Sequence, residues 1–335
     1  MISLALLVSR LRAAGETTRL RILRLLAEGE LTVSELTQVL GQSQPRVSRH
    51  LKLLLDAGLI ERHPEGAWVF YRLVEGDDAG SPGAFLRRLM TEMSPEDATI
   101  GADSERRARV TAVREEQAAR YFADNAAQWN EIRALYIPEA EVEAEMADLL
   151  GEGPHELLVD LGTGTGRVLE VLAPQFKRAI GFDVNHAMLG VARVNLERAG
   201  LKSVHVRHGD LMALPLPAAT AGAVVLHQVL HFLDNPAGAI AAATRLLMPS
   251  GQLLIVDFAP HDLEFLRTEH AHRRLGFSQD EVSRWCRSAG LSVSAVRTLA
   301  PLATQKSDAQ SLTVNLWLAR APKSALNASQ PERAA

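Results

Sequence analysis

The chain has 335 residues, more than one compact domain usually needs, and a formal net charge of −4. Its one cysteine, Cys286, excludes a disulfide framework and a thiolate metal cage within a single chain. No stretch approaches the roughly 18 apolar residues that a membrane span requires, and Arg10 and Arg12 interrupt the short apolar run at the start. We therefore expect a cytoplasmic protein of two domains with no contact to membranes.

Composition divides the chain into four segments. Residues 1–80 hold short leucine-rich helical patterns and one pair of strand-like runs, and residues 81–150 are mainly charged and helical. In residues 151–322 apolar strand-like runs alternate with helical patterns, which favours βαβ units and a mainly parallel sheet. Residues 323–335 are small and polar, and we expect them to be disordered. The expected fold class is therefore an α+β domain, a helical linker and an α/β domain.

The first segment contains two short helical patterns joined by a tight turn. In residues 31–41, Val33, Leu36 and Leu40 share one face, and Gly41 is a natural C-cap. Residues 43–54 follow, with one apolar stripe and a basic outer face, which is typical of a helix-turn-helix whose second helix enters the major groove. The residues that we expect to contact DNA are Ser43, Gln44, Arg46, Ser48, Arg49, His50 and Lys52 from this helix and Arg62 beyond it.

Two strand-like runs, residues 59–63 and 67–72, follow the basic helix, and we expect Pro64-Glu65-Gly66 to turn the chain between them. This hairpin would be the wing of a winged helix-turn-helix. The alternative is a small helical core whose charges are merely solvated. The order of helix, turn, basic helix and hairpin favours DNA binding.

Four stretches, residues 18–26, 29–36, 43–52 and 57–60, resemble the ArsR/SmtB family of bacterial regulators. The resemblance implies a homodimer that binds double-stranded operator DNA as an inverted repeat. Its dimer contacts would come from the first helix and the Phe85–Met90 helix. Thr32 and Ser34 stand where metal-sensing members carry thiolates, and hydroxyls are poor ligands for soft metals, so we expect no metal site.

The third segment opens with a cofactor-binding pattern. An apolar strand at 157–161 runs into the loop Gly162–Gly166 and then a helix, which allows the backbone to approach a ligand at the helix N-terminus. A second strand ends in Asp183, an acid suited to the two hydroxyls of a ribose, and a third is followed by Asp210. A nicotinamide-binding or flavodoxin-like fold stays open as an alternative.

These segments resemble class I S-adenosylmethionine-dependent methyltransferases over about residues 115–320. The resemblance implies a Rossmann-like sheet that binds S-adenosylmethionine or its demethylated product, S-adenosylhomocysteine. Asp160 would position the amino group of the cofactor, Asp183 would hold the ribose hydroxyls, and Asp210 would accept from the adenine amine. The cofactor residues that it implies are Asp160, Gly162, Thr163, Gly164, Gly166, Asp183, Met188, Asp210, Leu211 and His227.

The catalytic residue is not readable from a cofactor motif, because alignment with a good leaving group supplies much of the catalysis of methyl transfer. The candidates after the fourth and fifth strands are His227, His231 and His261, although a lone histidine at such a place is more often structural. Two functions remain. We favour a repressor whose second domain senses the cofactor; the alternative is an active methyltransferase of an unknown acceptor, which could be a small molecule, with a DNA-binding module attached.

Overall fold

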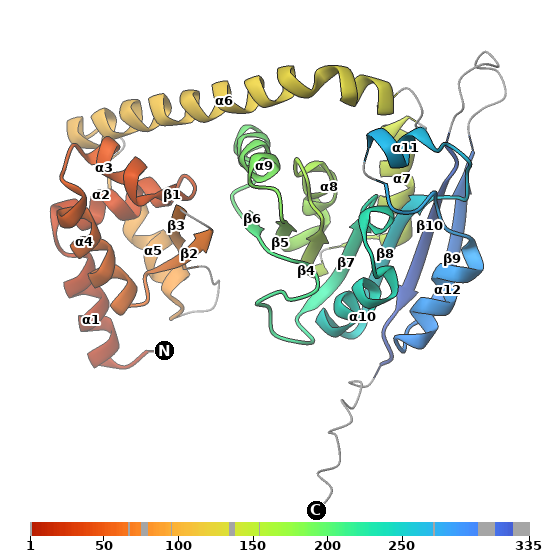
Figure 1. Cartoon of the computed structure of the whole chain (residues 1–335). Coiled ribbons are helices and arrows are strands. Elements are labelled where there is room, and N and C mark those ends of the chain that lie inside the picture. Colours follow the sequence, from red (N-terminus) through yellow and green to blue (C-terminus); the bar gives the residue numbers. More distant parts are fainter. Residues whose placement is uncertain are drawn as a thin grey trace, which may run out of the picture. The chain divides into compact units, whose positions relative to one another are not determined.

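The computed structural model describes residues 2–65, 68–74, 80–94, 96–133, 138–153, 155–270, 272–300 and 312–323. It divides into two compact units, Met1–Gln117 and Ala118–Ala335 (Figure 1). The helix α6 (Ala98–Arg133) contributes residues to both. The four-segment division made from the sequence stays a prediction, and its last segment lies outside the described residues after Lys323. None of the described helices has both the length and the hydropathy that crossing a membrane demands.

The first unit is a helical core with a small sheet. Leucine, isoleucine and valine side chains of its helices form that core, and Leu86 and Val110 extend it. Its elements are α1 (Leu4–Ala14), α2 (Thr17–Leu26), β1 (Leu31–Thr32), α3 (Val33–Leu40), α4 (Gln44–Asp56), β2 (Ile60–Glu65), β3 (Trp68–Leu73), α5 (Pro82–Thr91) and the start of α6.

Helix α3 begins at Val33, the first residue of its apolar stripe. Leu31 and Thr32 instead form β1, which pairs with β3. The Thr32 side chain accepts from the Glu35 backbone N–H and the Glu35 side chain accepts from the Thr32 backbone N–H, a capping box that fixes the start. Gly41 ends the helix in the left-handed conformation, at φ +65°. The predicted helix-turn-helix is confirmed, with α4 as its second helix.

The wing hairpin is longer than its sequence pattern. β2 and β3 are antiparallel and in register from Ile60–Leu73 to Glu65–Trp68, in a sheet of order β1-β3-β2. The predicted turn at residues 64–66 is therefore wrong, because Pro64 and Glu65 belong to the strand. Proline is tolerated there because β2 is an edge strand. Residues 66 and 67 lie outside the described part of the chain.

The second unit is a seven-stranded sheet with helices on both faces (Figure 1). Its elements are α7 (Glu139–Leu150), β4 (His155–Leu161), α8 (Arg167–Leu172), η1 (Ala173–Gln175), β5 (Phe176–Asp183), α9 (His186–Arg198), β6 (Val204–His208), β7 (Ala221–His227), η2 (Leu230–Phe232), α10 (Pro236–Leu246), β8 (Leu247–Phe258), α11 (Phe265–Glu269), α12 (Gln279–Ser288), β9 (Ser292–Leu299) and β10 (Val314–Arg320). Residues of α7, α8 and α9 share one core cluster, and those of α10 and α12 share the other.

The strand order is β6-β5-β4-β7-β8-β10-β9. The first five strands are parallel to one another, and β10 is antiparallel to both β8 and β9. This order confirms the predicted Rossmann-like methyltransferase sheet, and it differs from the flavodoxin-like order, in which the first strand lies between the second and third. The chain runs outward in both directions from β4 and β7, so the loops that follow these strands border the switch point at which ligands bind in open α/β sheets.

Candidate functional site

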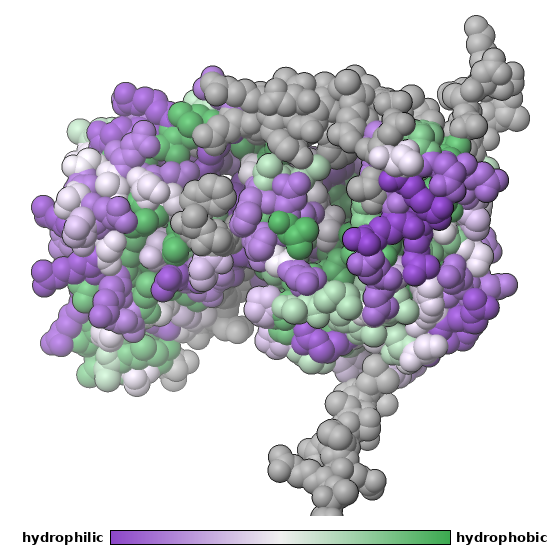
Figure 2. Space-filling model, viewed as in Figure 1, coloured by the Kyte–Doolittle hydropathy of each residue, from purple (hydrophilic) through white to green (hydrophobic). Residues whose placement is uncertain are grey.

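Helix α4 has a buried stripe and an exposed basic face. Val47, Leu51 and Leu54 are at most 1% exposed and anchor the helix in the core. Arg46, Arg49 and Lys52 are exposed on the remaining surface, which is largely hydrophilic in the view of Figure 2. Among the described residues none of these three cations has a hydrogen bond or an ion pair, so their charges are available to an anionic partner. Further predicted DNA contacts that are exposed on this helix and the wing are Ser43, Gln44, Ser48 and Arg62.

His50 differs from the other predicted DNA contacts. Its ring is half-buried, and Nδ1 lies 3.5 Å from a carboxylate oxygen of Glu16, which caps α2. Burial lowers the pKa of His50, and the nearby arginines lower it further while Glu16 opposes them. His50 therefore packs α4 against α2, and its contact with DNA stays a prediction.

An ion pair lies beside Thr32 and Ser34, the two positions at which metal-sensing members carry thiolates. Glu35 accepts from Nε and Nη2 of Arg114, both at 2.7 Å, and from the hydroxyl of Thr32 at 2.9 Å. Burial raises the pKa of Glu35, but these hydrogen bonds outweigh burial and the pKa is lowered overall. Within the described ranges, no group of three or more His, Cys, Asp or Glu side chains is arranged to hold a metal ion.

The glycine loop after β4 is held in left-handed backbone conformations. Gly162, Gly164 and Gly166 have φ of +78°, +53° and +82°. A Cβ on Gly162 would lie 2.5 Å from a methyl carbon of Val229, whereas one on Gly164 would meet nothing within 4 Å. The loop thus needs glycine at both positions for its conformation, and at Gly164 it faces open space into which a ligand can fit.

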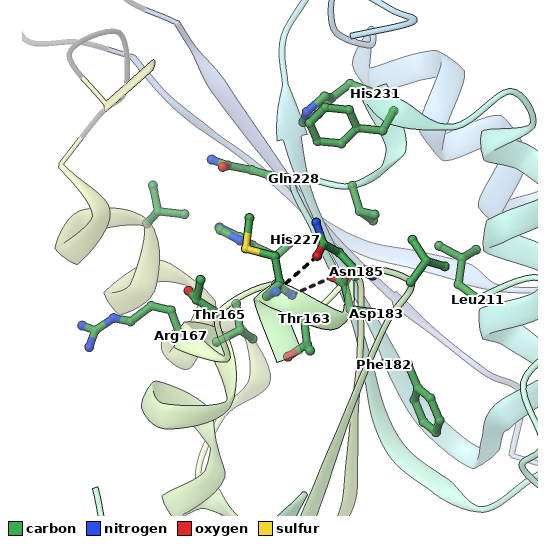
Figure 3. Close-up of a pocket in the computed structure, with 18 of the residues that line it drawn as sticks. Thr163, Thr165, Arg167, Phe182, Asp183, Asn185, Leu211, His227, Gln228 and His231 are labelled. Atoms are coloured by element: carbon green, nitrogen blue, oxygen red, sulfur yellow. Dashed lines mark hydrogen bonds between the residues drawn. The ribbon is translucent and has the colours of Figure 1, made fainter. Parts of the chain in front are cut away.

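Asp183 ties the end of β5 to this loop. Its carboxylate accepts from the backbone N–H of Gly164 and of Asn185, both at 2.8 Å (Figure 3). Asn185 in turn caps α9 by accepting from Ala187 and Met188. The carboxylate is thereby fixed at the edge of the cavity beside the loop, where it can accept from the hydroxyls of a ribose.

One cavity of about 790 Å³ lies over the carboxyl ends of the parallel strands. This volume lies in the upper half of the range of roughly 300–1,000 Å³ usual for small-molecule sites. The described residues around it that the sequence had suggested for a cofactor are Gly162, Thr163, Gly164, Asp183, Met188, Asp210, Leu211 and His227. Figure 3 shows Asp183 and Asn185 toward one end, with Gln228 and His231 toward the other.

His231 occupies the second end of the cavity in a hydrogen-bonded pair. Its Nδ1 lies 2.8 Å from a carboxylate oxygen of Asp257, which is fully buried in β8. Asp257 also accepts from the backbone N–H of Leu230 at 3.0 Å and of Phe258 at 2.8 Å. His227 lines the same cavity, and burial lowers its pKa to about 4, so it is neutral at neutral pH.

Two family profiles match the chain. That of the bacterial regulatory proteins of the arsR family matches residues 16–62, and that of a methyltransferase domain matches residues 159–255. The chain joins an arsR-family DNA-binding domain to a methyltransferase domain. The resemblances noted in the sequence are thereby confirmed for both halves.

Curated relatives match parts of the chain. A Streptomyces fradiae protein of transposon Tn4556, described only by its mass of 37.1 kDa, is 31% identical over 55% of this chain and 56% of its own length. A demethylmenaquinone methyltransferase of Deinococcus radiodurans is 33% identical over 39% of this chain and 54% of its own. The chain thus spans about half the length of these two relatives. A ubiquinone biosynthesis O-methyltransferase of Hahella chejuensis is 26% identical over 52% of this chain and 81% of its own.

Among solved structures, the YcgJ protein of Bacillus subtilis superposes with a TM-score of 0.48 at 18% identity. The match covers 55% of this chain and all of that one. Likeness at this level says nothing about activity.

In the methyltransferase domain, Asp160 lies beneath the cavity and is not one of the residues that line it. It is 1% exposed and accepts from the Thr163 hydroxyl at 2.6 Å. Burial raises its pKa to about 7; the charge of Asp183 adds to this rise and the Thr163 hydrogen bond opposes it. Gly166 also stands outside the lining. Both residues shape the loop, and their contact with a cofactor stays a prediction.

The three histidine candidates separate in the structure. His227 and His231 line the cavity, and His261 does not. The sequence reasoning missed Asp257, Phe232 and His272, of which the last two also line the cavity. No local signal points to Asp257 as the partner of His231, because it sits within a continuous apolar strand 26 residues further on. That partnership depends on β7 and β8 being neighbours.

Proposed function

We propose that this protein is a transcriptional regulator of the arsR type, a repressor, whose methyltransferase domain binds S-adenosylmethionine or S-adenosylhomocysteine as its effector. The observation that carries the proposal is the cavity at the switch point, where the glycine loop meets Asp183 and Asp210. A glycine loop with an acid at the end of the next strand suits a ribose-containing ligand. The chain would act in the cytoplasm, where it reaches its operator.

The cofactor would lie along the glycine loop. Asp183 is positioned to accept from the ribose hydroxyls, and Met188 and Leu211 offer apolar contact for the adenine. Asp210, whose carboxylate accepts from the Met212 backbone N–H at 2.9 Å, would take the adenine amine. Asp160 would act on the cofactor through Thr163, whose hydroxyl it holds. S-adenosylmethionine carries an electrophilic methyl group that S-adenosylhomocysteine lacks, and this difference would be the signal.

Operator DNA would meet α4, with Arg46 and Arg49 toward base edges and Lys52 toward phosphate. A second copy of the chain would place an equivalent helix one turn of DNA away. The contacts of this homodimer would come from α1 and α5. Leu4 and Leu11 on α1 are 78% and 50% exposed, which supports a partner for that helix.

Helix α6 is our candidate for coupling the two activities. Its arginines bind the DNA-binding domain at three places: Arg106 to the Val39 carbonyl, Arg107 to the Glu28 carbonyl and Arg114 to Glu35. The helix continues without interruption to Arg133, past the end of that unit. A ligand that favours one conformation of α6 would change operator affinity through these contacts.

A gel-shift titration on the region upstream of the protein's own gene tests this function. It is run with no ligand, with S-adenosylmethionine and with S-adenosylhomocysteine, on the wild type and on Asp183→Ala. We expect one ligand to change the affinity of the wild type by at least about fivefold and to leave Asp183→Ala unchanged. Identical binding curves under all three conditions would exclude the sensor role.

A second candidate function is turnover, and the pair of His231 and Asp257 at the cavity favours it. A sensor needs only the cofactor end of the cavity, whereas an enzyme needs a second end with room and chemistry for an acceptor. Incorporation of a tritiated methyl group, screened against small molecules and against the protein's own operator, tests turnover directly.

A further inference from the structure

The cavity continues beyond the cofactor residues into a second set of side chains. These come from η2 and from the segment after α11, which lie together because the His231 carbonyl accepts from the backbone N–H of Arg273 at 2.9 Å and of Arg274 at 3.2 Å. The proposed cofactor contacts use none of them. The members that line the cavity are His231, Phe232, Leu233, His270 and His272.

The hydrogen bonds around Asp257 fix how His231 is used. Asp257 receives two backbone N–H donors and is fully buried, so an ionised carboxylate is satisfied there. Because Nδ1 of His231 donates to this carboxylate, the lone pair of the neutral ring lies on Nε2. An imidazole oriented by a buried carboxylate, with its other nitrogen left as an acceptor, is the arrangement of a general base.

Three neighbouring histidines bring no positive charge to His231. The His272 ring lies 4.2 Å from it between centroids, and the Phe258 ring 5.0 Å. Burial lowers the pKa of His272 to about 3 and that of His227 to about 4, and burial also lowers the pKa of His261. These three histidines are neutral at neutral pH, so none of them adds a positive charge beside His231.

One feature of this end indicates the chemistry of the acceptor. Phe232 is 43% exposed although it lines the cavity, so an aromatic ring is available for stacking. An acceptor with an aromatic ring of its own would use this surface.

The charges of the described residues around the cavity disfavour an anionic acceptor. Arg167 is the one arginine or lysine among its described lining residues, and its Nε and Nη1 pair with Glu143 at 2.6 Å and with Glu170 at 3.2 Å. A carboxylate or phosphate would meet repulsion without compensation. The acids in the lining are Glu139, Glu143, Glu170, Asp183 and Asp210.

We propose that His231, oriented by Asp257, is the general base that activates an uncharged aromatic hydroxyl for O-methylation, with Phe232 stacking on the acceptor ring. This inference rests on the proposed cofactor site and on the second candidate function, turnover. A phenol needs such help more than an amine or a thiolate, because its neutral oxygen is a weak nucleophile.

The step conserves atoms and charge. Nε2 of His231 accepts the hydroxyl proton, and the electron pair of that O–H bond stays on oxygen. The oxygen bonds to the methyl carbon of S-adenosylmethionine while the carbon–sulfur bond breaks and its electron pair goes to sulfur. The aryl methyl ether and S-adenosylhomocysteine are formed, and the imidazolium then releases its proton to water. Asp257 stays ionised throughout and stabilises the imidazolium.

The test uses 4-nitrophenol, a phenol whose ionised form is yellow, with the full chain saturated with S-adenosylhomocysteine. Binding is measured by equilibrium dialysis and ionisation by absorbance, at a pH at which the free probe is largely protonated. The variants are His231→Gln, Phe232→Ala and the control His155→Gln, at the start of β4 and away from the cavity.

We expect the wild type and His155→Gln to bind the probe largely as phenolate. In His231→Gln the ratio of ionised to protonated bound probe should fall roughly tenfold or more, equivalent to at least one pKa unit of the probe. Phe232→Ala should weaken binding and keep that ratio.

Absence of probe binding to the wild type, or bound probe that stays protonated there, overturns the proposal. So does an equal ratio in the wild type and His231→Gln. If His231→Gln does not fold, the measurements on the wild type alone decide the outcome. Failure of S-adenosylhomocysteine to bind the wild type is a separate result, which instead contradicts the proposed cofactor site.

Discussion

Replacing Gly162 by alanine should destabilise the methyltransferase domain by about 2–5 kcal/mol. At φ +78° an L-residue pays a conformational cost of roughly 1–2 kcal/mol. The new Cβ would lie 2.5 Å from one Val229 carbon and 3.0 Å from another, and forced overpacking adds about 1–3 kcal/mol. Val229 cannot turn away at low cost, because a β-branched side chain has few rotamers.

Gly164→Ala is the matched control. Gly164 sits two residues on in the same loop with φ +53°, but its Cβ would meet nothing within 4 Å. We expect it to lose only the conformational part, about 1–2 kcal/mol. Because that Cβ occupies open space in the loop beside the cavity, Gly164→Ala should nevertheless weaken S-adenosylhomocysteine binding.

Hydrogen exchange read by mass spectrometry measures both variants within the full chain. Peptides from β4 and β7 report the free energy of opening of the methyltransferase domain, and peptides from α3 and α4 serve as an internal reference. Equal losses in the two variants would refute the steric argument at Gly162. Unchanged ligand affinity in Gly164→Ala would refute the assignment of the loop to the cofactor.

Three further predictions concern single side chains. Arg49→Ala should lower operator affinity by roughly tenfold and reduce the slope of log affinity against log salt concentration by about one unit. Gel shifts measure this, with Lys177→Ala as the control, and unchanged affinity would contradict the DNA contact. Glu35→Gln should cost about 3 kcal/mol of unfolding free energy, because it removes the carboxylate charge that faces the half-buried Arg114. The pKa of Glu35 is lowered in the folded state. The stability that Glu35 contributes is therefore present above pH 4.5, its ordinary pKa, and is lost as the pH falls through the lowered pKa. Urea titrations at several pH values should show this loss in the wild type and not in Glu35→Gln. The pKa of Asp160 is raised to about 7, so the stability it gives when protonated is lost as pH rises through about 7. Asp160→Asn should remove that loss, and an unchanged pH profile of hydrogen exchange would disprove it.

The parts of the site that follow from local patterns were predictable. The apolar stripe of α4 fixes which side chains face outward, so the exposure of Arg49 and Lys52 could be read from spacing. The glycine loop and Asp183 follow directly from strands and helices that are adjacent in sequence. For the same reason the sheet itself could be predicted, since βαβ units constrain the order of parallel strands.

What the sequence did not reveal depends on tertiary contacts. The burial of Asp160 could not be read from its motif, because the neighbouring Thr163 hydroxyl satisfies the carboxylate only in the folded loop. His231 and Asp257 become partners only because β7 and β8 pair side by side. The arginines of α6 reach Glu28 and Glu35 across about 80 residues of chain, and no periodicity encodes such a distance.

The coupling of the two domains through one bound ligand is the central claim, and isothermal titration of S-adenosylhomocysteine into the full chain tests it most directly. The titration is run with and without a saturating fragment of the region upstream of the protein's gene. We predict one binding event per chain, with a dissociation constant that the DNA changes by about 5- to 150-fold, because coupling between two sites is reciprocal. Binding of the same affinity in both titrations would contradict the account.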